Sequence, residues 1–82
     1  MSATQKNHYR VLIERDEDGF FVATVPSLPG CHTQAKTYAD LMRRVREAIE
    51  LCLDVAKTDA SYRKKILLSH EPTFVGMEMV SL

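Results

Sequence analysis

Two short runs near the start of the chain have the alternation and composition of β-strands. In residues 9–14, Tyr9, Val11 and Ile13 occupy alternate positions, which would place them on one face of an extended segment. Residues 20–25 are rich in aromatic and β-branched side chains, which pack well on a pleated surface. The pattern predicts two strands, the first with one face turned inward.

Turn residues separate these two runs and end the second one. Asp18-Gly19 lies between them, and this pair is a strong hairpin signal because Gly adopts the positive φ that the turn needs. Pro26 ends the second run because it has no N–H to donate to a ladder. In the next turn Pro29 fixes one φ and Gly30 permits a positive one. We therefore expect an antiparallel hairpin followed by a tight turn.

A long amphipathic segment follows a short third strand, which is expected at residues 31–34. Thr37 is a good N-cap, and Asp40 stands three residues later, where an acid favours a helix N-terminus. Apolar residues then recur at helical spacing, at Leu41, Val45, Ala48, Ile49, Cys52, Val55 and Ala56. We predict a helix from about residue 38 to residue 57 that buries this stripe on the sheet.

The last third of the chain is less regular. Residues 58–65 are polar and basic, and residues 66–68 (Ile-Leu-Leu) fit either a helical turn or an extended stretch. The alternating segment 73–80 predicts a last strand. The whole pattern predicts one α+β domain over residues 9–82, after a flexible N-terminus at residues 1–8. Its order, β-β-β-α-β, indicates a two-layer sandwich with one main helix on a mostly antiparallel sheet.

Composition narrows the class of protein. The 82 residues include 11 Lys+Arg and 11 Asp+Glu, so the formal net charge is +0 and no overall field gathers phosphates. We therefore expect no direct nucleic-acid binding. No apolar run approaches the ~20 residues of a membrane span, so we expect none. The N-terminus is polar, so we expect no signal peptide. Cys31 and Cys52 would then be free thiols in a reducing cytoplasm. The small core favours self-association or a partner.

An ordered series of short motifs over residues 9–56 resembles the HicB family. The series is a strand, an acidic turn ending in Gly, an aromatic strand, then Pro26-Ser27-Leu28-Pro29-Gly30-Cys31-His32-Thr33-Gln34 and a helix with Glu47-Ala48-Ile49. A long ordered set is far more specific than any one of its motifs. Ala35 departs from the Gly that family members often have there. The motif residues with an expected structural role are Gly19, Pro26, Pro29, Gly30, Cys31, Thr33, Glu47 and Ala48.

The resemblance implies a partial RNase H-like fold without nuclease activity, and the antitoxin half of a type II toxin–antitoxin pair. The partner would be a HicA-type toxin, a small basic RNA-cleaving protein whose active site the antitoxin covers. The resemblance also implies a homodimer or a tetramer. Many HicB proteins carry a C-terminal DNA-binding segment. Because this sequence ends at Leu82, just after the last predicted strand, we expect a short form without operator binding.

The residues expected to contact a toxin lie in the predicted hairpin. Asp16, Glu17 and Asp18 form an acidic turn that would steer a basic partner, although Asp-Gly is also explained by turn chemistry alone. Phe20 and Phe21 are consecutive in a strand, so one faces the helix and the other faces outward. An outward aromatic side chain is a candidate interface anchor. One helix leaves the second sheet face open for a dimer contact or a toxin.

The other polar clusters favour structural interpretations. Glu47, Glu50 and Asp54 share one helix face and, with Glu14, raise the hypothesis of a metal-dependent RNase H-type nuclease. Arginines interleave with that face, as on an ordinary solvated helix. The sequence around Cys31 lacks the paired spacing of a zinc site. We expect no catalytic residue, no metal and no cofactor.

Three hypotheses for the function remain. The first is a HicB-like antitoxin that works by binding alone. The second is a solitary, homo-oligomeric HicB-like protein with another partner, and the third is the nuclease. Two basic patches, Arg43-Arg44 and Arg63-Lys64-Lys65, are not interleaved with aromatic residues, so they favour solubility and helix-end electrostatics over nucleic-acid contact.

Overall fold

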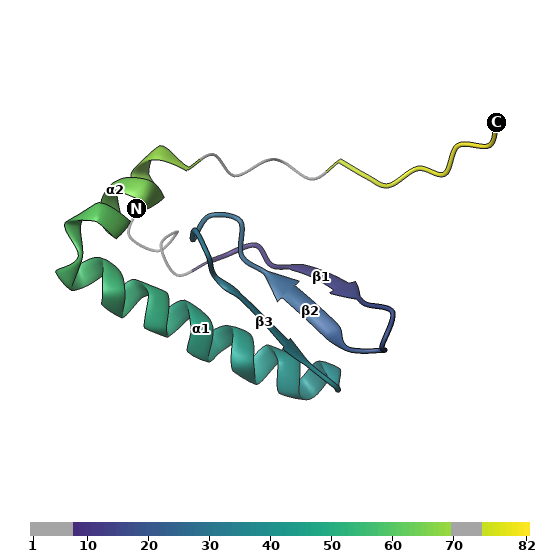
Figure 1. Cartoon of the computed structure of the whole chain (residues 1–82), viewed down its shortest axis with the longest axis horizontal. Coiled ribbons are helices and arrows are strands. Elements are labelled where there is room, and N and C mark those ends of the chain that lie inside the picture. The colour runs from purple at the N-terminus through teal and green to yellow at the C-terminus, as the bar shows by residue number, and fades with distance from the viewer. Residues whose placement is uncertain (1–7, 70–74) are drawn as a thin grey trace.

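A computed structural model describes residues 8–69 and 75–82 of the chain (Figure 1). The elements in chain order are β1 (Leu12–Arg15), β2 (Phe21–Thr24), β3 (His32–Ala35), α1 (Tyr38–Thr58) and α2 (Ala60–Leu68). The α+β class, the antiparallel sheet and the single main helix are confirmed. The first two strands are two residues shorter than predicted, and the third is shifted by one residue. The main helix begins at the predicted residue, Tyr38.

The sheet has the order β1-β2-β3, and both neighbouring pairs are antiparallel. Ile13 is opposite Ala23, and Ala23 is opposite Thr33. Directly opposed residues of an antiparallel ladder share a face, so these three lie on the side of Ala23, which is buried against the helix. With β2 in the centre, β1 and β3 are the two edges of the sheet.

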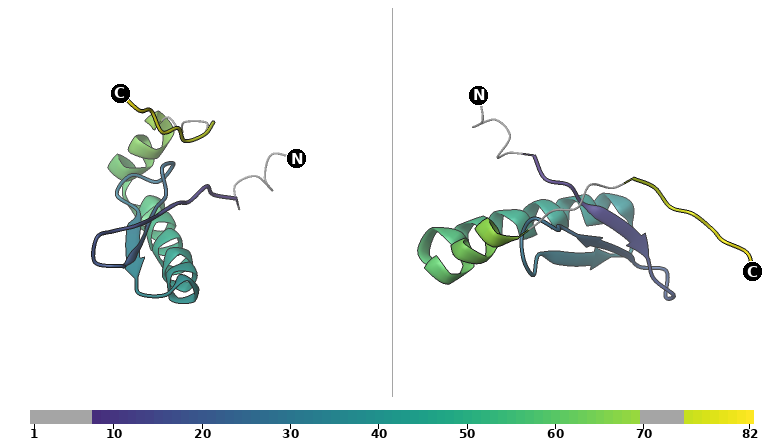
Figure 2. Two further views of the ribbon diagram at one scale, coloured as in Figure 1. Left: turned by 90° about the vertical axis from the view of Figure 1, so that its right-hand side faces the viewer. Right: turned by 90° about the horizontal axis from the view of Figure 1, so that it is seen from above.

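The core lies between α1 and the β2–β3 half of the sheet (Figure 2). Its buried residues are Ala23, Val25, Leu28, Cys31, Ala35, Leu41 and Val45. Because α1 crosses β2 and β3, the helix side of β1 is only partly covered. Ile13, predicted to face inward, is 38% exposed and its neighbour Leu12 is 44% exposed. Tyr9 and Val11 are half-buried against the core.

The second helix occupies the stretch that the sequence left open. Asp59 separates the helices: its N–H donates to the Val55 carbonyl at 2.9 Å, and its carboxylate accepts from the Tyr62 N–H at 3.2 Å. The Tyr62 hydroxyl donates to the Pro29 carbonyl at 2.8 Å, which holds α2 against the turn between β2 and β3. Residues 66–68 are therefore helical.

The predicted strand at 73–80 is wrong for the residues that the structure describes. Residues 75–82 have no regular secondary structure, and their side chains are exposed. Figure 1 shows this segment running past the sheet without joining it. An alternating pattern makes a strand only when an open edge supplies ladder hydrogen bonds, and among the described residues no segment pairs with the outer side of β1. Residues 73–74 and the expected flexible N-terminus up to residue 7 lie outside the described residues.

Candidate functional site

The acidic turn joins β1 to β2, and Asp16 builds its geometry. The Asp16 N–H donates to the Phe20 carbonyl at 2.9 Å, and the Gly19 N–H donates to the Asp16 carbonyl at 3.1 Å. One carboxylate oxygen of Asp16 accepts from the backbone N–H groups of Asp18 at 3.0 Å and Phe20 at 2.9 Å. Gly19 has a φ of 86°, which favours glycine. Asp16 is thus partly committed to the turn.

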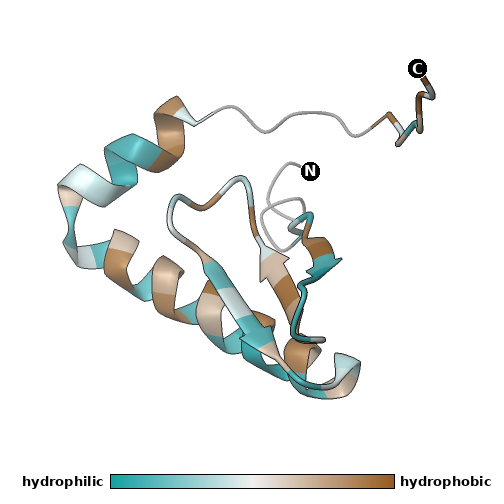
Figure 3. Cartoon of the chain, turned by 45° about the vertical axis from the view of Figure 1, so that its right-hand side comes forward, coloured by the Kyte–Doolittle hydropathy of each residue, from teal (hydrophilic) through white to brown (hydrophobic). Residues whose placement is uncertain are grey.

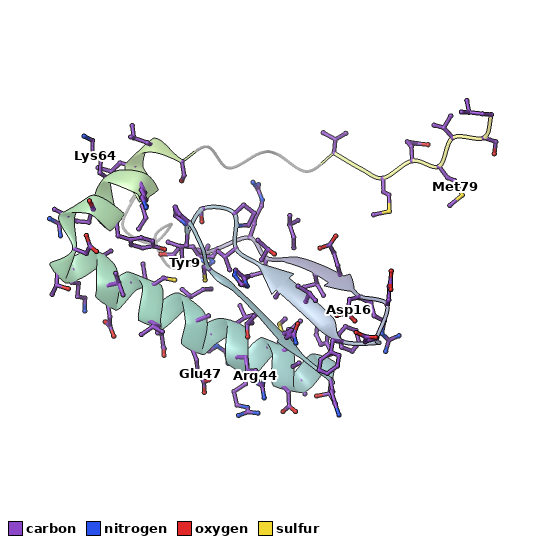
Figure 4. The ribbon with its side chains drawn as sticks, in the orientation of Figure 1. Tyr9, Asp16, Arg44, Glu47, Lys64 and Met79 are labelled. Atoms are coloured by element: carbon purple, nitrogen blue, oxygen red, sulfur yellow. The ribbon has the colours of Figure 1, made fainter. Side chains whose placement is uncertain are left out.

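Glu17 and Asp18 are exposed beside Asp16 at one end of the molecule. Figure 4 labels Asp16 at this hairpin tip, well away from the Glu47 side of α1. Three neighbouring carboxylates on a narrow, exposed turn attract a basic partner at a distance, because exposed charges act mainly on the rate of encounter. The structure therefore keeps Glu17 and Asp18 available for such a contact.

The two phenylalanines take different neighbours. Phe21 is half-buried on the helix side, where its ring packs edge to face on Tyr38 at a centroid distance of 6.1 Å. The Arg15 guanidinium lies 4.6 Å from the centre of the same ring. Phe20 is also half-buried, and the Lys36 ammonium lies 5.8 Å from its ring centre. Each of the two rings thus has a cation beside it, at the end of the sheet next to the acidic turn.

The turn that carries the Pro-Gly-Cys motif is closed by backbone hydrogen bonds. The Val25 N–H donates to the Cys31 carbonyl at 2.9 Å, and the Cys31 N–H donates to the Leu28 carbonyl at 3.0 Å. Gly30 has a φ of 75°. Pro26 is half-buried in this turn. These residues shape the turn and bury Leu28 and Cys31 in the core.

The turn between β2 and β3 that carries Pro-Gly-Cys, here called the motif turn, meets both helices. At this place the side chains of Cys31, Cys52 and Tyr62 interact. Burial raises the pKa of the Cys31 thiol to about 12, and its contact with Cys52 adds to that rise. Burial and then Cys52 also raise the pKa of Tyr62. Both cysteines are free, and a thiol held neutral in this way is a packing group rather than a nucleophile. Sequence reasoning missed Tyr62, because its Pro29 contact spans 33 residues and leaves no local pattern.

The carboxylates of the nuclease hypothesis are not brought together. Glu14 lies on β1, whereas Glu47 and Asp54 are exposed on α1. Figure 4 shows Glu47 on the side of α1 away from the sheet. In the ranges 8–69 and 75–82, no group of three or more His, Cys, Asp and Glu side chains could hold a metal ion. Of the remaining motif residues, Thr33 and Ala48 are half-buried.

Three arginines of the two basic patches make structural contacts. The Arg44 guanidinium donates to the Gln34 carbonyl at 3.0 Å and so ties α1 to β3. Arg43 pairs with Asp40 at 2.9 Å, and this pairing lowers the pKa of Asp40. Arg63 donates to the Ala56 carbonyl at 2.7 Å near the end of α1. Arg63 alone makes its contact at the end of a helix, whereas Arg44 connects α1 to the sheet and Arg43 pairs within α1.

The described residues form two mostly apolar hollows. The first is about 450 Å³ and lies between α1 and Tyr9, just before β1; it is lined by Tyr9, Met42, Val45, Arg46, Ile49, Glu50 and Leu53. The second is about 600 Å³ and follows the free edge of β1, lined by Arg10, Val11, Leu12, Ile13, Glu14, Thr24 and Met77. Sequence patterns missed both hollows, since each brings together residues that are far apart in the sequence.

The fold and these surfaces define a small α+β protein whose described residues offer an acidic turn and an open sheet edge. Residues 9–74 match the sequence model of the HicB-like antitoxin of bacterial toxin–antitoxin systems, and the chain belongs to this family. A UPF0150 protein of Archaeoglobus fulgidus is 63% identical over 74 residues, which cover 90% of this chain and 93% of the relative. A UPF0150 protein of Synechocystis is 40% identical over 75 residues, covering 92% and 94%.

No solved structure gives a significant match to the chain. The relation to RNase H therefore stays a prediction. Among the described residues, no helix has both the length and the apolar character needed to cross a membrane.

Proposed function

We propose that this chain is the antitoxin of a toxin–antitoxin pair and neutralises a small, basic, HicA-type RNA-cleaving toxin by covering its active site. The family match over residues 9–74 carries this proposal. The protein would act by binding alone, without a metal or cofactor, in the cytoplasm.

The hairpin tip is the part of the surface best suited to guide a basic toxin. Glu17 and Asp18 are exposed in a turn that ends at Phe20, whose backbone N–H donates to Asp16. In a chain of zero net charge, attraction of a cation must come from such a local cluster. The tip would speed the encounter, and the neighbouring half-buried aromatic surface would supply apolar contact.

The test is co-expression with the product of the neighbouring gene, if that gene encodes a small basic chain. The antitoxin should relieve the growth arrest that the neighbour causes, and the two should elute together on gel filtration. Persistent arrest together with separate elution contradicts the proposal. An RNA-cleavage assay of the mixture then shows whether binding also blocks the active site.

Charge reversal tests the surface. In Glu17→Lys with Asp18→Lys, the association rate with the toxin should fall at least ~10-fold at low salt, and the difference should shrink as salt is added. Asp16 is left intact because it builds the turn. The matched control is Glu47→Lys with Asp54→Lys, which makes the same charge change on the exposed face of α1. Equal losses in both variants would show that the tip has no special role.

The alternative of a solitary, self-associating protein has its own support in the exposed apolar segment at residues 75–82. It predicts normal assembly of the purified chain but no complex with the neighbouring gene product. The nuclease alternative has no support from the geometry, because its carboxylates are spread over β1 and the outer face of α1.

A further inference from the structure

The C-terminal segment, residues 75–82, presents apolar side chains that the rest of the described chain leaves exposed. Its large apolar residues, at least 78% exposed, are Val75, Met77, Met79, Val80 and Leu82. Figure 3 shows this hydrophobic colouring on a segment that extends away from the body of the molecule. Leaving such side chains in water costs about 25 cal/mol for each Å² of apolar surface. The segment therefore gains free energy wherever it finds a cover.

The outer edge of β1 is the complementary surface. β1 is an edge strand, so its outward N–H and C=O groups have no ladder partner among the described residues. Leu12 and Ile13 are 44% and 38% exposed along it. An unpaired, partly apolar edge is a template for another strand. The hollow of about 600 Å³ follows this edge, and the hollow of about 450 Å³ lies against α1 beside Tyr9, just before β1.

The side-chain pattern of the segment fits this edge. In an extended conformation Val75, Met77 and Met79 share one face, because side chains alternate along a strand. A strand added beside β1 would turn one face toward α1, over the hollow of about 450 Å³ between Tyr9 and Ile49. Methionine side chains are flexible and fill irregular apolar gaps well.

We propose that residues 75–82 of one copy add as a fourth strand to the β1 edge of a second copy, and that the second copy returns the same contact. Within one chain, Met77 borders the hollow along β1, yet it remains 88% exposed and the segment makes no ladder. Within the described ranges, a single copy thus leaves both surfaces open. A two-fold exchange covers both surfaces on both copies, and exchange of an identical element is a low-cost route to a dimer.

The size and charge of the proposed contact suit a stable dimer. The eight residues of the segment and the thirteen body residues that line the two hollows would enter the interface from each copy. That total falls within the roughly 20–30 residues a side of a stable interface. The chain has a net charge of +0, so two copies do not repel one another through their overall charge. The inference does not depend on the proposed toxin.

The experiment is sedimentation analysis of the full-length chain and of Met77→Pro with Glu78→Pro. Successive N–H groups of a strand point to opposite sides, so one of these two prolines must remove a ladder hydrogen bond to β1. The unchanged chain should be a dimer, or an assembly of dimers, and the variant should dissociate to monomers with its dissociation constant raised ~100-fold or more. The matched control, Ser81→Pro, places a proline near the end of the same segment and should preserve the assembly.

Mixing two defective variants separates exchange between copies from pairing within one chain. Tyr9→Asp with Ile13→Asp disables the receiving edge, and the proline variant disables the donated segment. Each alone should be monomeric with an unchanged far-ultraviolet circular dichroism spectrum, and the mixture should form a heterodimer through the one intact contact. If the edge variant is unfolded, amide exchange of the unchanged chain replaces this arm: residues 75–80 should be protected in the assembly and unprotected after dilution to monomers.

The inference is overturned if the unchanged chain is a monomer, or if its assembly survives the paired prolines. It is also overturned if the two folded variants do not associate when mixed, or if residues 75–80 are protected from amide exchange in the monomer. The last result would mean that the segment pairs with β1 of its own chain. None of these results bears on toxin binding, which the co-expression experiment tests separately.

Discussion

At the scale of single residues, Asp16 shows that an acidic side chain can be both a surface charge and a structural part. Its carboxylate accepts the backbone N–H groups of Asp18 and Phe20, while Glu17 beside it is simply exposed. The sequence grouped these acids together as possible toxin contacts. Only the hydrogen bonds show that Asp16 shapes the turn, whereas Glu17 is an exposed surface charge.

This difference predicts unequal effects of two neighbouring substitutions. Asp16→Ala should lower the free energy of unfolding by about 1–2 kcal/mol, because two backbone N–H groups lose their acceptor. Glu17→Ala, the matched control, should change it by less than about 0.5 kcal/mol. Urea unfolding followed by circular dichroism measures both values. A loss from Glu17→Ala as large as that from Asp16→Ala would contradict the structural role given to Asp16.

At the scale of elements, α2 is the part that only long-range contacts explain. Its residues 60–68 contain no buried side chain, and Tyr62 attaches it to the Pro29 carbonyl across the chain. The same contact region holds Cys31 and Cys52 with Tyr62. The attachment of α2 to the motif turn therefore depends on groups that are favoured in their neutral forms.

This arrangement predicts a loss of stability in alkali. The folded pKa of Cys31, about 12, lies above the ordinary value of 9.0, and the pKa of Tyr62 is also raised. A group whose pKa is raised in the folded state stabilises the fold fully at a pH below its unfolded pKa. That stabilisation is lost as the pH rises toward the folded pKa. The urea midpoint should thus fall between about pH 9 and about pH 12.

The control for the alkaline effect is Cys31→Ala combined with Tyr62→Phe. This variant should be less stable at neutral pH, because it loses the hydroxyl contact to Pro29, but its midpoint should depend less on pH over the same interval. The comparison is made by urea unfolding of both proteins across that interval. Identical slopes would place the alkaline sensitivity in other groups.

At the scale of the whole molecule, the small core and the two open surfaces make stability a property of the assembly. Only seven described residues form the buried core, while apolar side chains at residues 75–82 and along β1 stay exposed. A small domain buries too little surface to be very stable alone. Association that occurs only in the folded state adds stability by mass action.

This coupling predicts that the melting temperature depends on protein concentration. For the unchanged chain, the midpoint should rise by several degrees for a hundredfold increase in concentration, because folding and association are linked. The paired proline variant, Met77→Pro with Glu78→Pro, should melt at a lower temperature that does not change with concentration. Calorimetry at several concentrations measures both midpoints. A midpoint independent of concentration in the unchanged chain would contradict the coupling.

The sequence by itself determined the local structure of this protein. Strand alternation, the Asp-Gly turn and the Thr37 cap predicted the hairpin and α1, since each depends on residues that are close in the chain. The order of the motifs also predicted the family that the comparison confirms. Local hydrogen bonds and periodic burial follow from neighbouring residues, so a single sequence is enough to predict them.

The tertiary structure decided what those elements leave uncovered. The crossing of α1 over β2 and β3 exposes β1, and because residues 75–82 form no fourth strand, its edge has no ladder partner in the part of the chain that the structure describes. The contact of Tyr62 with Pro29 likewise depends on where α2 meets the motif turn. Alternation shows that a segment can form a strand, but an available edge at the right distance decides whether it does. That edge exists only once the whole chain has packed.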